Sequence, residues 1–289
     1  MIPPAFEYLR PKTLPEAVAM LQQHGDDAKI LSGGQSLIPM MKLRLARPSH
    51  LIDINRVSGL SYVKEEGGFL KIGGLTREAE LEASSVVRAK YPLLMDTATV
   101  IADPQVRNMA TVGGNLAHGD PANDHPATML AMGAQVVATG AKGERVIAID
   151  DFFVSLFTTA LEHDEILTEI RIPIPPAHSS GAYFKLERKV GDFATAATAV
   201  QVTLDDKGTI QKIGIGLTNA GPTPLRAKSA EDALRGKKPD AALINQASQL
   251  AMDSADPSAD LRGPAEYKKG LIKELTKRAL TRALERASK

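Results

Sequence analysis

The chain changes its pattern of secondary structure at one short cluster of prolines, Pro173-Ile174-Pro175-Pro176. Proline cannot donate a backbone hydrogen bond and fixes its own φ angle, so such a cluster ends a strand and favours a domain boundary. After the cluster the pattern predicts strands at 183–189, 194–204 and 209–218, then helices at 227–234, 240–252 and 264–287. Strands followed by helices are typical of an α+β domain with an antiparallel sheet.

Before the cluster, helices and strands are mixed. Thr13-Leu14-Pro15-Glu16 is a capping box with proline in the first turn, and it predicts a helix that ends near Gly25. The pattern also predicts helices at 37–45 and 124–132, helical patterns that fill 76–102, and strands at 28–31, 50–54 and 165–172. Two hairpins are expected, at 62–72 and at 135–149.

Composition excludes several classes of protein. Lys and Arg number 35 and Asp and Glu number 34, and no basic tract is present, so we expect no nucleic-acid partner. No apolar run approaches a membrane span, and the N-terminus lacks the pattern of a secretory signal, so we expect a cytoplasmic protein. The chain has no cysteine, which excludes a disulfide framework, a Cys nucleophile and a Cys-ligated iron–sulfur cluster in this chain.

Two segments contain adjacent glycines with polar flanks. The first, Ser32-Gly33-Gly34-Gln35-Ser36, lies between a predicted strand and a predicted helix, and the second is the predicted loop Thr111-Val112-Gly113-Gly114-Asn115. Glycine allows positive φ and removes the side chain that would block a ligand, and successive free N–H groups form an anion-binding concavity. A following helix N-terminus adds partial positive charge. The two segments are therefore suited to hold a pyrophosphate between them, although two ordinary tight turns would give the same pattern.

Other site hypotheses have less support. No dinucleotide-binding or P-loop glycine motif is present, and the cluster Gly214 to Gly221 lies in a strand pattern that favours close sheet packing. His118, Asp120, Asp124 and His125 are a candidate metal site by residue type, but Pro121 and Pro126 make this segment rigid. We predict no metal site and no catalytic nucleophile or base.

Three stretches carry a family resemblance. They are SGGQSLIPMMKLRLARPSHLIDIN, IADPQVRNMATVGGNLAHGDPANDHPA and KLERKVGDFATAA, and the resemblance extends from MIPPAFEY to DLRGPAEYKK. The chain resembles the FAD-binding medium subunits of molybdenum hydroxylases, including that of aerobic carbon monoxide dehydrogenase. The resemblance implies an α+β flavoprotein of the vanillyl-alcohol-oxidase (PCMH) type. It implies an N-terminal FAD-binding subdomain at 1–57, a middle FAD-binding subdomain at 58–176 and a C-terminal α+β domain at 177–289.

The resemblance also implies which residues bind FAD. It places both glycine segments on the pyrophosphate, the strand that leads into the first segment along the cofactor, and Phe193 beside the isoalloxazine ring, where relatives often have Tyr. Phe can pack against a flavin but has no hydroxyl to donate. The implied FAD contacts are Lys29, Ile30, Leu31, Ser32, Gly33, Gly34, Gln35, Ser36, Leu37, Ile101, Thr111, Val112, Gly113, Gly114, Asn115, Asp124, Leu167, Lys185 and Phe193.

The implied function is that of the flavin subunit of a complex. A small subunit with [2Fe-2S] clusters and a molybdopterin large subunit would be its partners, in a dimer of heterotrimers, and FAD would pass electrons from a cluster to an external acceptor. Two alternatives remain open on the sequence. They are an assembly subunit without FAD and a stand-alone flavin oxidase, for which the sequence offers no base.

Overall fold

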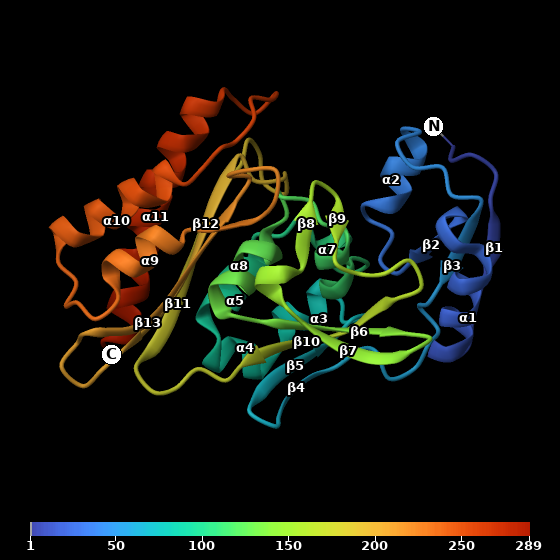
Figure 1. Cartoon of the computed structure of the whole chain (residues 1–289), viewed down its shortest axis with the longest axis horizontal. Helices are drawn as coiled ribbons and strands as arrows, with labels where there is room; N and C mark the ends of the chain where they lie inside the picture. Colours follow the sequence, from blue (N-terminus) through green and yellow to red (C-terminus); the bar gives the residue numbers. More distant parts are fainter. Residues whose placement is uncertain (1) are drawn as a thin grey trace.

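The computed structural model describes residues 2–289, and it shows three sheets arranged in a row from the N-terminal to the C-terminal end of an elongated molecule (Figure 1). Each of the three predicted regions contains one of these sheets, while the boundaries at 57/58 and 176/177 remain predictions. The fold is mixed α and β, as the sequence predicts.

The N-terminal sheet is parallel, with strand order β1-β3-β2. Its helix α1 begins where Thr13 caps it, since the Thr13 side chain accepts a hydrogen bond from the Glu16 N–H. Ala17, Val18 and Leu21 of α1 are buried against the sheet. The elements are β1 (Glu7–Leu9), α1 (Leu14–His24), η1 (Gly25–Asp27), β2 (Ala28–Leu31), α2 (Leu37–Lys42) and β3 (His50–Asp53).

The middle sheet is antiparallel, with strand order β4-β5-β10-β6-β7, and it packs on short helices. Its strands are β4 (Val63–Glu66), β5 (Phe69–Gly73), β6 (Gln135–Gly140), β7 (Gly143–Ala148) and β10 (Ile166–Pro173). The helices are α3 (Glu78–Ala83), α4 (Ser85–Lys90), α5 (Pro92–Thr99), α6 (Pro104–Arg107), α7 (Val112–Ala117) and α8 (Asp124–Met132). The turn η2 (Ile149–Asp151) leads to a separate hairpin of β8 (Phe153–Ser155) and β9 (Thr158–Thr159).

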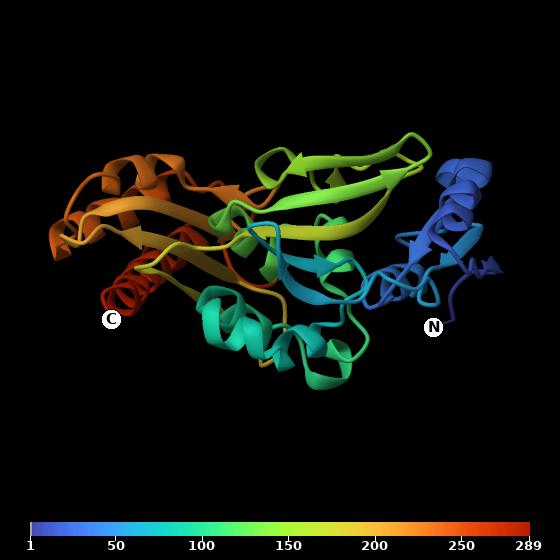
Figure 2. The ribbon, with the colours of Figure 1, turned by 90° about the horizontal axis from the view of Figure 1, so that it is seen from below.

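The C-terminal sheet has helices on both faces. Helices α9–α11 cover one face, while α5 and α8 of the middle region pack on the same sheet (Figures 1 and 2). Two glycines of β13 allow this contact, because a Cβ at Gly214 or Gly216 would overlap a backbone carbonyl of α8. The elements are β11 (Ser179–Leu186), β12 (Ala196–Leu204), β13 (Ile210–Thr218), β14 (Leu225–Arg226), α9 (Lys228–Leu234), α10 (Ala241–Asp253) and α11 (Ala265–Ala287).

Two local predictions are wrong. The second glycine segment is not a loop, since Thr111 caps α7 and both glycines lie in its first turn. The helix expected over 37–45 ends at Lys42, since Arg44 has a φ of 67°. The helical patterns predicted over 76–102 are confirmed as three helices, because Ser84 ends α3 and caps α4, and Pro92 starts α5.

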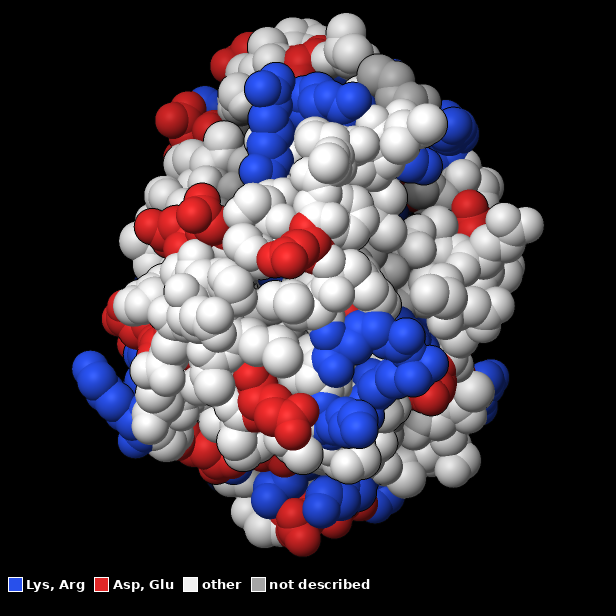
Figure 3. Space-filling model, turned by 90° about the vertical axis from the view of Figure 1, so that its right-hand side faces the viewer, with Lys and Arg blue, Asp and Glu red and all other residues white. Residues whose placement is uncertain are grey.

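The surface at the N-terminal end of the molecule carries both basic and acidic groups, and broad uncharged areas lie between these groups (Figure 3). No helix within residues 2–289 is long and apolar enough to cross a membrane.

Candidate functional site

A cleft with a volume of about 250 Å³, open to solvent, lies where the three regions meet. Its walls come from the first glycine segment, from the chain between α5 and α8, and from the turn between β11 and β12. The lining residues are Ile30, Ser32, Gly33, Gly34, Gln35, Ser36, Ile101, Ala102, Val106, Ala110, Thr111, Gly114, Asn115, Asn123, Asp124, Gly191, Asp192 and Phe193.

The two glycine segments lie side by side in this cleft. Ser32 Oγ and Thr111 Oγ1 are 3.1 Å apart and share a hydrogen bond. The Gly114 N–H also donates to Thr111 Oγ1, over 3.1 Å. The segments that the sequence predicts to act together are thus joined directly by their side chains.

The four glycines are required for different reasons. A Cβ at Gly33 would lie 2.5 Å from the Met109 carbonyl oxygen, and one at Gly113 would lie 2.5 Å from the Gly74 carbonyl oxygen. These two glycines therefore allow the backbone of neighbouring segments to pack. Gly34 has a φ of +71°, which favours glycine. A Cβ at Gly114 would lie 2.6 Å from Thr111 Oγ1.

Polar groups without protein partners face the cleft. Within the described chain, the backbone N–H groups of Gly34, Gln35 and Ser36 have no acceptor. Asn115 Oδ1 is buried and has no hydrogen-bond partner, although Asn115 lines the cleft. A buried polar atom without a partner is rare in folded proteins, so Asn115 Oδ1 fits a ligand that donates a hydrogen bond in the cleft. The free N–H groups of Gly34, Gln35 and Ser36 are donors of the kind that a phosphate group accepts from, while the phosphate site itself stays a prediction.

A polar clasp behind the cleft holds the two segments from the other side. Asn55 Nδ2 donates to the Ser32 carbonyl over 2.8 Å. Arg77 donates to Asn55 Oδ1 over 2.6 Å and also to the Met109 carbonyl. This clasp was not predicted, since the spacing of Asn55 and Arg77 in the sequence gives no sign of it.

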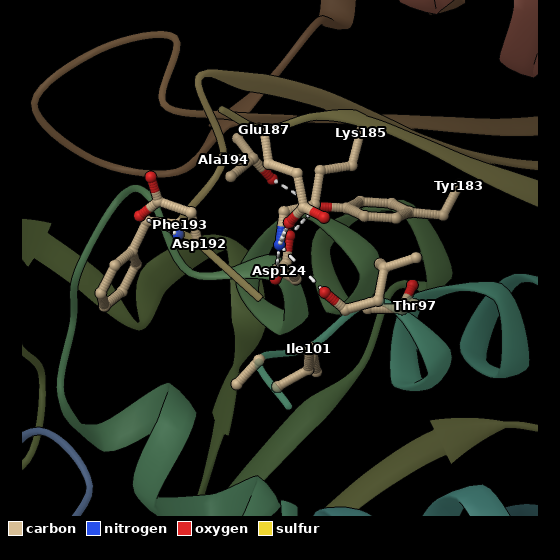
Figure 4. Close-up of polar contacts among 12 residues, drawn as sticks. Thr97, Ile101, Asp124, Tyr183, Lys185, Glu187, Asp192, Phe193 and Ala194 are labelled. Carbon is tan, nitrogen blue, oxygen red and sulfur yellow. Dashed lines mark hydrogen bonds and ion pairs between the residues drawn. The ribbon is translucent and has the colours of Figure 1, made fainter. Parts of the chain in front are cut away.

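Asp124 is at the base of the cleft and is the first residue of α8. It accepts hydrogen bonds from the Tyr183 hydroxyl at 2.6 Å and from Lys185 Nζ at 3.0 Å. Burial raises the pKa of the Asp124 carboxyl, and the charge of Lys185 opposes that shift. Figure 4 shows Tyr183 and Lys185 converging on Asp124.

Lys185 is part of this buried group and does not line the cleft. Its side chain is 3% exposed, and Nζ donates to the Val100 carbonyl over 3.0 Å and lies 3.1 Å from Glu187 Oε2. Tyr183 is buried as well, which is the largest cause of the strongly raised pKa of its phenol. The structure therefore places Lys185 behind Asp124, where it pairs with the carboxylate of a residue that lines the cleft.

A smaller pocket shares part of its lining with the cleft. Leu167 lines this pocket, and Ile30, Ser32 and Gly114 line both spaces. Gly113 also lines the smaller pocket. Of the 19 predicted residues, 14 line one or both of these two spaces.

The other predicted residues lie outside the lining. Lys29 is an exposed residue of β2, and Val112 is fully buried in the core of the middle region. Leu31 packs beside Gly34, and Leu37 starts α2. Sequence reasoning missed six residues of the lining, although all of them belong to stretches that resemble the family: Ala102, Val106, Ala110, Asn123, Gly191 and Asp192.

The residues of the alternative metal site do not converge. His125 Nε2 is 2.8 Å from Glu78 Oε2 in the core, and His118 Nε2 is 3.9 Å from Asp120 Oδ2. Burial lowers the pKa of His118. Among residues 2–289, no three His, Cys, Asp or Glu side chains form a group that could hold a metal ion.

Comparison with known proteins agrees with this geometry. Residues 4–175 match the FAD binding domain in molybdopterin dehydrogenase, and residues 181–283 match the CO dehydrogenase flavoprotein C-terminal domain. The carbon monoxide dehydrogenase medium chain of Hydrogenophaga pseudoflava is 48% identical, and the match covers 100% of both chains. The 6-hydroxypseudooxynicotine dehydrogenase complex subunit alpha of Paenarthrobacter nicotinovorans is 37% identical, over 99% of this chain and 97% of that one.

A solved structure has the same fold over nearly the whole chain. It is the carbon monoxide dehydrogenase of Hydrogenophaga pseudoflava that lacks the Mo-pyranopterin moiety, with a TM-score of 0.96, 49% identity and coverage of 99% of each chain. The relatives are named as chains or subunits of dehydrogenases. The chain belongs to the family of FAD-binding subunits of molybdopterin dehydrogenases.

Proposed function

We propose that this chain is the electron-transfer subunit of a molybdenum hydroxylase complex, in which bound FAD carries electrons from [2Fe-2S] clusters of a partner subunit to an external acceptor. The observation that carries the proposal is the cleft in which both glycine segments meet, in a chain that matches flavin subunits over its full length. The absence of cysteine supports a division of labour, since this chain cannot supply thiolate ligands to a cluster.

The residues of the cleft would hold the cofactor in distinct ways. The free N–H groups of Gly34, Gln35 and Ser36 would bind the pyrophosphate, and Asn115 Oδ1 would accept a hydrogen bond from a hydroxyl or N–H group of the cofactor. Ile101 and Phe193 offer apolar surface to the ring system, and Asp124 offers a carboxylate that Lys185 and Tyr183 hold in place. The chain's own role is to bind, orient and shield, while the redox chemistry belongs to the cofactor.

We propose that this chain carries out no substrate chemistry itself. Asp124 is already engaged by Tyr183 and Lys185, so it is not a free general base. The relatives are named for carbon monoxide and for 6-hydroxypseudooxynicotine, which are different substrates. We propose that the substrate is oxidised on a molybdopterin large subunit, in a dimer of heterotrimers that also contains the iron–sulfur small subunit.

The experiment is a measurement of flavin in the complex purified with its native partners. We expect FAD at one per copy of this chain, identified by the visible absorption spectrum and by chromatography of the released flavin. A complex that carries molybdenum and iron but no flavin would instead support the alternative, an assembly subunit without cofactor.

A further inference from the structure

The turn between β11 and β12 forms one wall of the cleft. Gly191 at its tip approaches the opposite wall, where a Cβ on it would lie 3.2 Å from the Ala102 carbonyl carbon. Phe193 follows; the residue is 42% exposed, and its ring is turned away from the Asp124 group (Figure 4). Val190, at 90% exposed, has almost no contact with the protein. The turn therefore depends on other contacts for its position.

Asp192 provides those contacts. One carboxylate oxygen accepts from Arg262 Nη2 at 2.9 Å and from the Phe193 N–H at 2.8 Å, and the other accepts from Arg188 Nε at 3.0 Å. These bonds hold the pKa of Asp192 at about 2, and the bond from Arg262 is the largest cause. The Arg262 guanidinium also lies over the Phe193 ring, 5.8 Å from its centroid.

Arg262 comes from a distant part of the chain, the segment between α10 and α11. This is the DLRGPAEYKK stretch, which the function so far leaves without a role. The backbone N–H of Arg262 donates to Asp260 Oδ1 over 2.8 Å, and Asp260 Oδ2 pairs with Lys268 Nζ at 2.9 Å. Lys268 is fully buried, and its Nζ also donates to the Ser258 carbonyl.

A fully buried lysine is costly unless it is paired and hydrogen-bonded. Here both partners of Lys268 belong to the segment that presents Arg262, so the buried charge fixes the shape of that segment. The neighbouring Leu261 is 92% exposed, so the segment is not held there by an apolar core. Its polar contacts instead converge on Arg262.

We propose that the segment of residues 258–268 is a clasp on the flavin site, in which Arg262 is a positioning residue that holds the Asp192–Phe193 turn over the cleft and so retains the cofactor. This rests on the proposed function, because the ligand of the cleft is taken to be FAD. Arg262 acts through Asp192 and Phe193 and does not line the cleft itself.

The test compares Arg262→Gln and Arg262→Lys with the unaltered complex, purified with its native partners. We expect Arg262→Gln to release FAD about tenfold faster, which corresponds to about 1.4 kcal/mol. Trypsin should also cleave after Arg188 or Lys189 faster in this variant, since the turn would be less fixed. Arg262→Lys should show a smaller increase in both FAD release and cleavage than Arg262→Gln, because lysine keeps the charge but not the planar fork.

A double-mutant cycle with Asp192→Asn separates this role from general loss of stability. If Arg262 acts through Asp192, the double variant releases FAD no faster than Asp192→Asn alone. The matched control is Arg278→Gln, an exposed arginine of α11 that pairs with Glu274. The control should leave both rates unchanged.

Unchanged FAD release and unchanged cleavage in Arg262→Gln would overturn the proposal. It would also be overturned if the two substitutions increased the rate of FAD release independently of each other in the double variant. If Arg262→Gln does not assemble, Asp192→Asn alone gives the same two measurements, and unchanged rates there overturn the proposal. Trypsin cleavage does not depend on flavin. A complex without FAD in which Arg262→Gln still accelerates cleavage would refute the proposed function while supporting Arg262 as the residue that holds the turn.

Discussion

At the scale of single residues, opposed effects act on the pKa of the Asp124 carboxyl. Burial raises the pKa of its carboxyl, while Lys185 and the Tyr183 hydroxyl stabilise the ionised form. Lys185 also lies near Glu187, so one cation faces two carboxylates. The family resemblance identifies Asp124 and Lys185, but not Tyr183 or Glu187, because only the fold brings the side chains of β11 under the start of α8.

Replacing this cation gives a prediction with a defined pH dependence. Lys185→Met leaves the buried Asp124 carboxylate without its partner and should reduce the free energy of unfolding by about 3–5 kcal/mol. The pKa of Asp124 in the folded state then rises further above its unfolded value, so the variant's stability is greatest at low pH and is lost as pH rises through the folded pKa. Urea unfolding at pH 5.5 and pH 8.5 measures this, and the loss should be larger at pH 8.5.

The double variant Lys185→Met with Asp124→Asn is the control, because it removes both charges. Its stability should depend less on pH than that of Lys185→Met. An equal loss at both pH values in the single variant would mean that Asp124 is not the group that titrates.

Asn115 allows ligand binding to be separated from folding. Its buried Oδ1 has no partner in the protein, so Asn115→Ala removes an unsatisfied group and should leave the melting temperature of the flavin-free chain unchanged or higher. The affinity for FAD should fall about tenfold, the effect of one neutral hydrogen bond from a donor group of the cofactor to Asn115 Oδ1. Isothermal titration with FAD and a thermal melt measure the two effects, and full affinity would exclude Asn115 from the site.

Gly33 and Gly113 are poorer choices for such a test. A larger residue at either position would collide with the backbone of a neighbouring segment, so loss of flavin would not distinguish binding from packing.

At the scale of elements, local signals were sufficient wherever one stretch of chain determines its own structure. The Thr13 cap places α1, and the predicted bounds of β2 and α8 agree with the structure. The same reasoning missed α7, because two glycines normally disfavour a helix, and here tertiary contacts at Gly74 and Ser32 require them. It also missed β1, three residues long, which exists only by pairing with β3.

The contact of β13 with α8 gives a prediction at this scale. Gly216→Ala should destabilise the protein by several kcal/mol and lower FAD content, because its Cβ would overlap the Ala127 carbonyl and displace the helix that begins at Asp124. Gly270→Ala in α11 is the matched control. It has nothing within 4 Å of its Cβ and should stabilise the helix by about 0.5–1 kcal/mol. Chemical unfolding of both variants measures the effect, and equal stability would contradict the packing argument.

At the scale of the whole molecule, the cleft is where the N-terminal region meets the other two. The polar links between the regions there are few, namely the Ser32–Thr111 bond and the Asn55–Arg77 clasp. The helices and strands of the N-terminal region pack mainly on one another, whereas α5 and α8 pack extensively on the C-terminal sheet. The sequence could not predict this difference, since it depends on glycines and alanines whose close approach appears only in the fold.

This difference predicts where FAD stabilises the chain. A ligand at about one hundred times its dissociation constant adds about 2.7 kcal/mol to the stability of every opening that disrupts its site. Separation of the N-terminal sheet disrupts the cleft, so hydrogen exchange in β2 and β3 should slow at least tenfold when FAD is restored to the flavin-free complex. Exchange at the far end of the C-terminal sheet, around Leu204 and Ile210, should change little, because that hairpin can open without disrupting the cleft. Mass spectrometry of peptides from both regions measures this, with the Asn115→Ala complex as control, and equal slowing in both would mean that the chain opens only as a whole.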